Sequence, residues 1–171
     1  DDKPDIITGN SGSASVTTVR NSGSGTLAPK IDFATGSSPN GVALGDLNGD
    51  ARIDIVTPNS ATVANSVSVL RSIPSSFAAK ADYSVGSAPS GVAIADLDGD
   101  GLQDIIAANS GDATISVLRN LMPAITSFTP ASAPTGATVT ITGLNLGTIT
   151  NVRFGNFNAA SFAIVSPSTI T

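Results

Sequence analysis

The stretch Asp96-Leu97-Asp98-Gly99-Asp100-Gly101-Leu102-Gln103-Asp104 places four carboxylates at positions 1, 3, 5 and 9 of a nine-residue loop. Its two glycines permit the tight backbone path that such spacing needs. Carboxylate oxygens are hard ligands, and a short turn rich in them suits Ca²⁺ better than other common ions. The stretch therefore predicts a calcium site.

The loop recurs earlier in the chain as Asp46-Leu47-Asn48-Gly49-Asp50-Ala51-Arg52-Ile53-Asp54. Asn48 still offers a carbonyl oxygen at position 3, and position 7, Arg52 or Leu102, is expected to contribute its backbone carbonyl. At position 6 the earlier loop has Ala51 where the later one has Gly101. If this position is left-handed, alanine costs roughly 1 kcal/mol there. With one charge fewer as well, the earlier site is expected to bind more weakly.

A partial third loop begins the sequence, with Asp1, Lys3 and Asp5 at positions 5, 7 and 9. Alone, these residues are expected to bind an ion poorly, and a neighbouring chain is expected to complete them. The predicted ligand positions are Asp96, Asp98, Asp100, Leu102 and Asp104 in the later loop, Asp46, Asn48, Asp50, Arg52 and Asp54 in the earlier loop, and Asp1, Lys3 and Asp5 in the partial one.

The loops belong to a longer repeat, because Asp5, Asp54 and Asp104 are 49 and 50 residues apart. Helical periodicity is absent, and each full repeat contains four short segments of strand character. In the last two repeats these segments are residues 77–85, 91–97, 104–108 and 114–119. Four strands in about 50 residues are typical of a β-propeller blade. The chain carries about two and a half blades, with boundaries near 49/50 and 99/100.

A different pattern follows Asn120. Met122-Pro123 is expected to be a linker, and strands are expected at 125–130, 134–143, 151–155 and 161–165. In the second of these, Val139 and Ile141 alternate with threonines and are predicted to point inward. The pattern indicates a small Ig-like β-sandwich over 122–171 that looks short of its last strands. The fold class is therefore all-β, with propeller-type blades over 1–121 and a sandwich after them.

Composition excludes several classes of function. Net charge is −5, and eight scattered Lys and Arg residues form no basic stripe, which argues against nucleic acid. No apolar run approaches the ~18 residues of a membrane span, so no membrane insertion is expected. The sequence contains no His and no Cys, and all 13 acidic residues are Asp, so Glu is absent as well. Few groups are thus left for acid–base chemistry, and the chain is not expected to be an enzyme.

The run "SAPSGVAIADLDGDGLQDIIAANSGDATISVLRN" resembles FG-GAP/VCBS repeats, as in integrin-α-type propellers and many bacterial surface proteins. This resemblance covers about residues 1–120 and implies calcium ligands at the loop positions given above. The run "PAITSFTPASAPTGATVTITGLNLGTITNVRFGN" resembles an IPT/TIG domain, an Ig-like fold of bacterial multidomain surface proteins. Both resemblances imply secretion, adhesion or assembly, and neither implies a defined reaction.

These observations favour a calcium-binding structural module outside the cell, secreted or on the surface of a bacterium or archaeon. The chain begins and ends within a pattern, so it is expected to be a fragment of a longer chain with flanking repeats or a subunit that polymerises with other copies through open strand edges. One alternative is an adhesin that binds a glycan or a surface protein through the loops at 59–65 and 109–113. Another is a non-catalytic fragment of a larger secreted enzyme.

Overall fold

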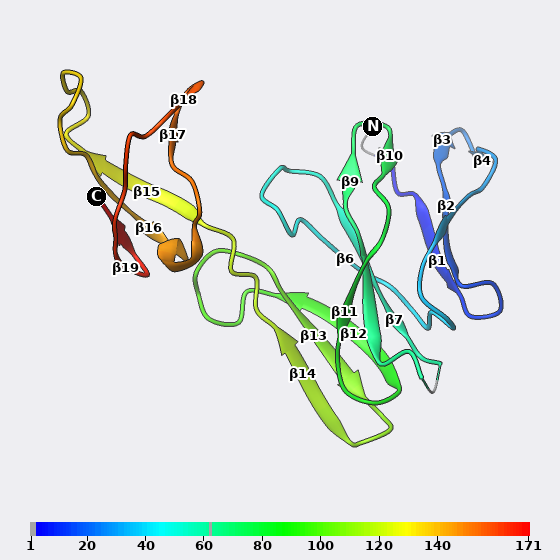
Figure 1. Cartoon of the computed structure of the whole chain (residues 1–171). Coiled ribbons are helices and arrows are strands. Elements are labelled where there is room, and N and C mark those ends of the chain that lie inside the picture. The colour runs from blue at the N-terminus through cyan, green and yellow to red at the C-terminus, as the bar shows by residue number, and fades with distance from the viewer. Residues whose placement is uncertain (1–2, 62) are drawn as a thin grey trace. The chain divides into compact units, whose positions relative to one another are not determined.

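The computed structural model describes residues 3–61 and 63–171 (Figure 1). The chain divides into two compact units, Asp1–Asn120 (unit 1) and Leu121–Thr171 (unit 2). Among the described residues, the single helical element is a 3-10 turn, η1 (Leu146–Thr148), and all other regular structure is antiparallel β-strand. The all-β prediction is confirmed.

The middle sheet of unit 1, called sheet 2 here, has four strands in the order β11-β8-β7-β6. Its strands are β6 (Ala43–Gly45), β7 (Asp54–Asn59), β8 (Ser66–Leu70) and β11 (Ala81–Ser84). A separate hairpin, β9 (Ser72–Ile73) with β10 (Ser76–Phe77), lies between β8 and β11 in the chain. The four-stranded repeat is therefore as predicted, but Phe77 belongs to the hairpin and not to the fourth strand.

The sheets on either side have three strands each. Sheet 1 contains β1 (Ile6–Asn10), β2 (Ser15–Val19) and β5 (Ile31–Ala34), with a hairpin of β3 (Asn21–Gly23) and β4 (Thr26–Leu27). Sheet 3 contains β12 (Pro89–Ala95), β13 (Asp104–Asn109) and β14 (Thr114–Leu118). Each is a meander of neighbouring antiparallel strands, as in Figure 1, and all three sheets are compatible with propeller blades.

Sheet 2 is covered on both faces. One buried cluster joins it to sheet 1 through Val16, Ile55 and Leu70, and the rings of Phe33 and Phe77 meet edge to face beside it. A second cluster joins it to sheet 3. Its buried members are Leu47, Val56, Val67, Val69, Ile105 and Ala107. Because both faces are packed, all six residues of β7 are buried. The polar ones, Asp54, Thr57 and Asn59, form hydrogen bonds with Ser72, Gly41 and Ser68.

In sheets 2 and 3 a buried asparagine packs against the chain that arrives from the preceding sheet. Asn59 donates from Nδ2 to Ser68 Oγ at 3.0 Å, and the backbone N–H of Gly36 donates to the same Oγ at 2.9 Å. A Cβ at Gly36 would lie 2.3 Å from the Asn59 side chain. Asn109 and Gly86 repeat this arrangement in sheet 3, where the corresponding distance is 2.5 Å. The approach is so close that only glycine fits.

Unit 2 is built on a four-stranded sheet in the order β15-β16-β20-β19. The strands are β15 (Ala124–Thr129), β16 (Thr140–Leu144), β19 (Ile164–Ser166) and β20 (Thr169–Ile170), accompanied by the hairpin β17 (Arg153–Phe154)–β18 (Phe157–Asn158). Ile141, Leu146 and Ile170 form its buried core, and Val139 packs against them. The inward positions predicted for Val139 and Ile141 are thus confirmed.

Candidate metal centre

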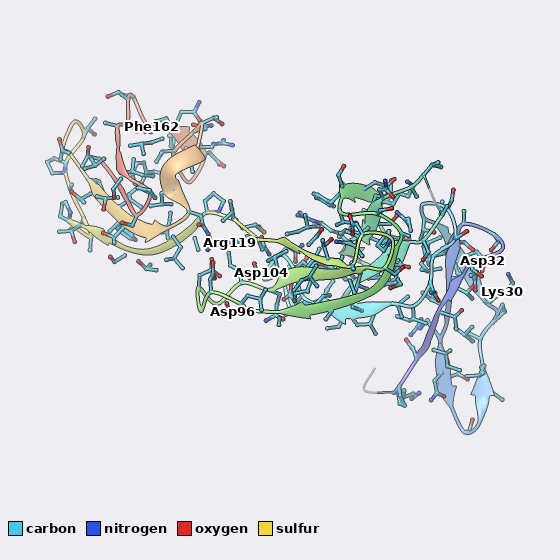
Figure 2. The ribbon with its side chains drawn as sticks, turned by 90° about the horizontal axis from the view of Figure 1, so that it is seen from below. Lys30, Asp32, Asp96, Asp104, Arg119 and Phe162 are labelled. Atoms are coloured by element: carbon cyan, nitrogen blue, oxygen red, sulfur yellow. The ribbon has the colours of Figure 1, made fainter. Side chains whose placement is uncertain are left out.

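The later acidic loop connects β12 to β13, whose last pair is Ala95 and Asp104. Because the two strands are antiparallel neighbours, both ends of the loop are held together, and Asp96, Asp104 and Arg119 lie at the same end of sheet 3 (Figure 2). The carboxylates of Asp96, Asp98 and Asp104 offer oxygens that all lie within 4.8 Å of one another. The fold thus gathers three of the four predicted acidic ligands.

Backbone amides shape this loop around Asp96. Its carboxylate accepts hydrogen bonds from the N–H groups of Gly99 at 2.8 Å and Gly101 at 2.9 Å. Both glycines are left-handed, with φ of 77° and 84°. A residue without a Cβ adopts this conformation without steric cost, which is the physical reason for glycine at positions 4 and 6.

Asp104 is almost fully buried, at 1% exposure. Its two carboxylate oxygens accept hydrogen bonds from the backbone N–H groups of Leu97 at 3.1 Å and Asn120 at 2.8 Å. A buried charge is stable only where it is compensated, and two neutral donors supply part of that compensation. Asp104 therefore closes the loop and also ties the end of β14 to the start of β13.

The arrangement fits Ca²⁺. Two unit charges 4.8 Å apart repel by roughly 3–4 kcal/mol at an effective dielectric constant of about 20, so three carboxylates in one place favour a cation. Ca²⁺ binds oxygens at about 2.3–2.6 Å, so ligand oxygens on opposite sides of the ion lie roughly 4.6–5.2 Å apart. The oxygens of Asp96, Asp98 and Asp104 lie within 4.8 Å of one another, which is close enough for all three to contact one ion.

Two features of the loop depart from the sequence expectation. Asp100, a predicted ligand, is outside the group of three, and its carboxylate accepts the N–H of Leu102 at 2.9 Å. The guanidinium of Arg119 pairs with the Asp98 carboxylate, which sequence reasoning did not foresee. The sequence feature that could have indicated this ion pair is the arginine that follows the third strand of every repeat. The backbone carbonyls of Leu102 and Arg52 stay predicted ligands.

The earlier loop follows the same backbone path. Asp46 accepts hydrogen bonds from the N–H groups of Gly49 at 2.8 Å and Ala51 at 2.7 Å. Ala51 is left-handed, with φ of 61°, so position 6 requires the conformation that the sequence analysis considered. Both loops therefore have the same backbone conformation, which at position 6 is sterically unfavourable for the alanine of the earlier loop.

The side chains of the two loops differ. The Asp50 carboxylate accepts hydrogen bonds from the Arg52 guanidinium at 2.6 Å and from the Asn48 amide at 2.8 Å. Over residues 3–61 and 63–171, Asp96, Asp98 and Asp104 form the one group of three acidic side chains close enough to share an ion. A weaker earlier site stays a prediction, because an arginine pairs with a ligand carboxylate in both loops, Arg52 with Asp50 and Arg119 with Asp98.

Asp46 is kept in its charged form. Desolvation, the largest single effect, raises its pKa, but hydrogen bonds from the backbone N–H groups of the loop together lower the pKa below the ordinary value of 3.8. The strongest of these donors is Ala51. The loop backbone thus favours the form of the carboxylate that binds cations.

Of the partial site, Asp1 lies outside the described residues. Lys3 donates from Nζ to the Ser22 carbonyl at 2.8 Å, and Asp5 Oδ1 accepts the backbone N–H of Asn21 at 2.8 Å. Asp5 therefore repeats the bond that Asp104 makes with Asn120. Position 9 has a structural role in every copy, a role that the ligand interpretation missed.

The two loops suggested for adhesion begin with residues that are buried. Asn59 and Asn109 are enclosed and bound to serines of their own sheets. Neither side chain is available to a glycan or a protein, and Thr62 lies outside the described residues. Ligand binding by the remainder of these loops stays a prediction.

Comparison with known families agrees with the sequence interpretation. Residues 1–57 match the FG-GAP-like repeat, a segment that includes the earlier acidic loop but not the later one, and residues 123–171 match the IPT/TIG domain. No curated protein and no solved structure matches the chain. Both families are typical of extracellular proteins and are typically non-catalytic. Within the described residues, no helix has the length and apolar character to cross a bilayer. The chain thus carries an FG-GAP-like repeat followed by an IPT/TIG domain.

Proposed function

We propose that this protein is a calcium-binding structural module of a secreted or cell-surface protein, in which the ion stiffens the β-sheets of unit 1. The observation that carries the proposal is the group of Asp96, Asp98 and Asp104 oxygens within 4.8 Å at the junction of β12 and β13. An ion there would join the two ends of the loop and cancel the repulsion between the carboxylates. The non-catalytic character of both families supports a structural role.

The expected contribution is modest and depends on calcium outside the cell. Extracellular modules hold Ca²⁺ with Kd of about 10⁻⁴–10⁻³ M. A free calcium concentration ten times Kd stabilises the folded state by about 1.4 kcal/mol per site. Asp98 would exchange the Arg119 guanidinium for the ion, so that part of the Coulomb gain is offset. The earlier loop would bind more weakly, because Arg52 competes for Asp50 and the alanine at position 6 is strained.

Assembly is the second part of the proposal. In sheets 1 and 2 the third strand is paired on both sides, as β2 pairs with β5 and β8 with β11. In sheet 3 the third strand, β14, lies at the edge of the sheet, and no further strand pairs with it among the described residues. An open edge of this kind is a template for another strand, from another copy or from a flanking repeat of a bacterial or archaeal surface protein.

Calcium binding is tested by calorimetric titration of the whole chain with CaCl₂ and by thermal melts in excess calcium and in excess chelator. We expect heat on titration and a melting temperature about 5 °C higher with calcium, from about 1.4 kcal/mol acting on unit 1. Asp98→Asn should lose most of the heat of binding. Asp112→Asn should keep it, because Asp112 is an exposed residue outside the two acidic loops. No heat together with an unchanged melt would refute the calcium proposal.

A further inference from the structure

The fourth strands of sheets 1 and 2 are held to the third strand by the same side-chain contact. Asp32 of β5 lies opposite Thr17 of β2 in the strand register. Asp82 of β11 lies opposite Ser68 of β8 in the same way. In both pairs the hydroxyl donates to the carboxylate, at 2.5 Å in sheet 1 and at 2.6 Å in sheet 2. Because a charged acceptor makes such a bond stronger than a neutral one, each fourth strand is recognised by one hydroxyl in addition to its backbone pairing.

The two fourth strands also share a sequence pattern. Residues 30–33 and 80–83 both have the sequence Lys-x-Asp-aromatic, and the pattern occurs nowhere else in the chain. In each, the lysine ammonium pairs with the aspartate carboxylate; Lys30 and Asp32 are labelled in Figure 2. Residues two apart on a strand face the same side of the sheet, so the lysine and the aspartate lie together there. The pattern thus supplies the acceptor for the hydroxyl together with its counter-charge.

Sheet 3 has the receiving strand of this contact but no fourth strand. Ser116 of β14 holds the repeat position of Ser68. Like Ser68, it accepts hydrogen bonds from the side-chain amide of a buried asparagine, Asn109, at 2.9 Å and from the backbone N–H of a glycine, Gly86, at 3.1 Å. After β14 the chain continues into unit 2 without a hairpin and a fourth strand, so within the described residues β14 pairs with β13 alone (Figure 1). The edge that receives the fourth strand in sheets 1 and 2 is therefore open in sheet 3.

The polar groups beside this open edge lack partners that their counterparts in sheet 2 have. There, the Ser68 hydroxyl lies 3.2 Å from Asn59 Oδ1 and 2.6 Å from Asp82 Oδ1. In sheet 3 the described strands place no aspartate opposite Ser116. Asn109 is 2% exposed, and its Oδ1 atom is buried with no hydrogen-bond partner among the described residues. Because buried polar groups are normally hydrogen-bonded, the polar centre of sheet 3 is incomplete without a fourth strand.

The turn that precedes β14 already has the conformation that receives a fourth strand. In sheet 1, the carbonyl of Ala14 accepts the backbone N–H of Thr35, just after β5, at 2.9 Å. In sheet 2, the carbonyl of Asn65 accepts that of Val85, just after β11, at the same distance. Ala113 holds this place before β14 and is left-handed like the other two, with φ of 53° against 48° and 38°. The backbone that receives the strand is thus formed although the strand is missing.

We propose that the edge of β14 binds an extended segment with the sequence Lys-x-Asp-aromatic, which pairs antiparallel to β14 and places its aspartate opposite Ser116. Strand addition of this kind takes its affinity from main-chain hydrogen bonds and its specificity from alternate side chains. In the register of β8 with β11, the aromatic residue lies opposite the repeat position of Ile115. Ile115 is 70% exposed, and an aromatic side chain across from a β-branched one stabilises a strand pair.

The partner segment comes from outside these 171 residues. Both copies of the pattern, 30–33 and 80–83, are already paired in sheets 1 and 2, so neither is free to add to β14 of another copy. This inference rests on the assembly part of the proposed function, to which it adds the chemistry of the partner, and it does not depend on calcium.

A fluorescein-labelled peptide with the sequence of residues 79–86 tests the edge by anisotropy titration with the whole chain. We expect saturable binding. A peptide with the Asp82→Ala substitution should bind about tenfold more weakly, because the Ser116 hydroxyl loses its charged acceptor. Ser116→Ala in the protein should weaken binding of the original peptide by a similar factor and leave binding of the Asp82→Ala peptide unchanged, since both substitutions remove one bond. Ser90→Ala, at an exposed serine outside β14, is the matched control and should bind like the wild type.

Three outcomes of the titrations would overturn the proposal: no saturable binding, equal binding of the two peptides, or a Ser116→Ala variant that does not distinguish between them. The peptide substitution leaves the protein unchanged, so the test remains decisive even where Ser116→Ala unfolds. Sedimentation of the chain alone gives a further check. Self-association that the peptide reverses would identify a second copy as the occupant and would also overturn the proposal.

Failure of this inference is distinguishable from failure of the proposed function. A scrambled peptide that binds as well as residues 79–86 refutes the stated chemistry of the partner and leaves the open edge as a template for strands. A chain that gives heat with calcium but binds no peptide refutes the partner and leaves the calcium site.

Discussion

The carboxylate of Asp104 accepts a hydrogen bond from the backbone N–H of Asn120 at 2.8 Å, joining the start of β13 to the end of β14. The same bond occurs in the other two repeats. It joins Asp5 to Asn21 at 2.8 Å and Asp54 to Ser72 at 2.7 Å. The aspartate at position 9 therefore links the start of one strand to the end of the next in each sheet, whether or not an ion is bound.

This relationship predicts that Asp104→Asn destabilises the protein even in excess chelator. An asparagine has one acceptor oxygen, so either the Leu97 or the Asn120 N–H would be left without its partner in a buried place. We expect a loss of about 1–3 kcal/mol in the free energy of unfolding by urea. Asp98→Asn is the matched control: in chelator it removes only the partly exposed pair with Arg119 and should cost less than about 1 kcal/mol, with a larger loss when calcium is present. Equal stability of Asp104→Asn and the wild type in chelator would contradict the structural role of the Asp104 hydrogen bonds.

The left-handed Ala51 predicts a stabilising substitution in the earlier loop. Ala51→Gly should raise the free energy of unfolding by about 1 kcal/mol, because glycine adopts φ of 61° without the steric cost of a Cβ. Gly101→Ala, at the same position of the later loop, should lower it by a similar amount. Urea denaturation of both variants in chelator measures the effect of the backbone alone. The strain assignment is wrong if the two substitutions shift stability in the same direction.

The close approach of Gly36 to Asn59 predicts that no residue with a Cβ is tolerated at position 36 without loss of stability. Gly36→Ala would place a Cβ 2.3 Å from the buried Asn59 side chain, so packing of sheet 1 on sheet 2 must shift. We expect a loss of about 1–3 kcal/mol in the urea unfolding free energy. Gly12→Ala is the control, since a Cβ there meets nothing within 4 Å. A Gly36→Ala variant as stable as Gly12→Ala would show that the contact is absent in solution.

Asp82 predicts a pH dependence of stability. Desolvation raises its pKa, but the Lys80 ammonium and the Ser68 hydroxyl together lower the pKa below 3.8. A carboxyl whose pKa is lower in the folded state stabilises the fold above its unfolded pKa, and this stability is lost as pH falls through the folded pKa. Asp82→Asn should therefore reduce stability at pH 7 and flatten its decline below about pH 4.

Urea midpoints measured between pH 7 and pH 2 test this effect. Lys80→Met should flatten the acid limb in the same way, because Lys80 is the main group that lowers the Asp82 pKa. Phe157→Leu, an exposed substitution in unit 2, should leave the slope unchanged. If Asp82→Asn keeps the full acid dependence of the wild type, other carboxyls carry it.

Much of the fold was predictable because it depends on local patterns. Alternation and the 49–50 residue period predicted strands and their repetition, and glycine at position 6 of the later loop indicated the left-handed turn that Ala51 also adopts. In unit 2, alternation placed Ile141 on the inner face. Each of these features follows from the backbone preferences of a few consecutive residues.

The side-chain partners were not predictable, because they come from distant parts of the chain. The pairing of Arg119 with Asp98 and the bond from Asn120 to Asp104 both depend on β14 returning beside the loop. The buried role of Asn59 depends on Gly36, which arrives from the preceding sheet. Sequence spacing indicated which residues carry oxygens, but not which of those oxygens meet.

The sequence by itself determined the repeat, the strands and the acidic loops, because these follow from spacing and local conformation. Tertiary structure decided what each equivalent position does. Val67 and Ile115 hold the same place in the repeat, yet one is buried beneath a neighbouring sheet and the other is open to water. The physical reason is that burial belongs to the packing of one sheet on the next, a property of the assembled sheets that no single repeat contains.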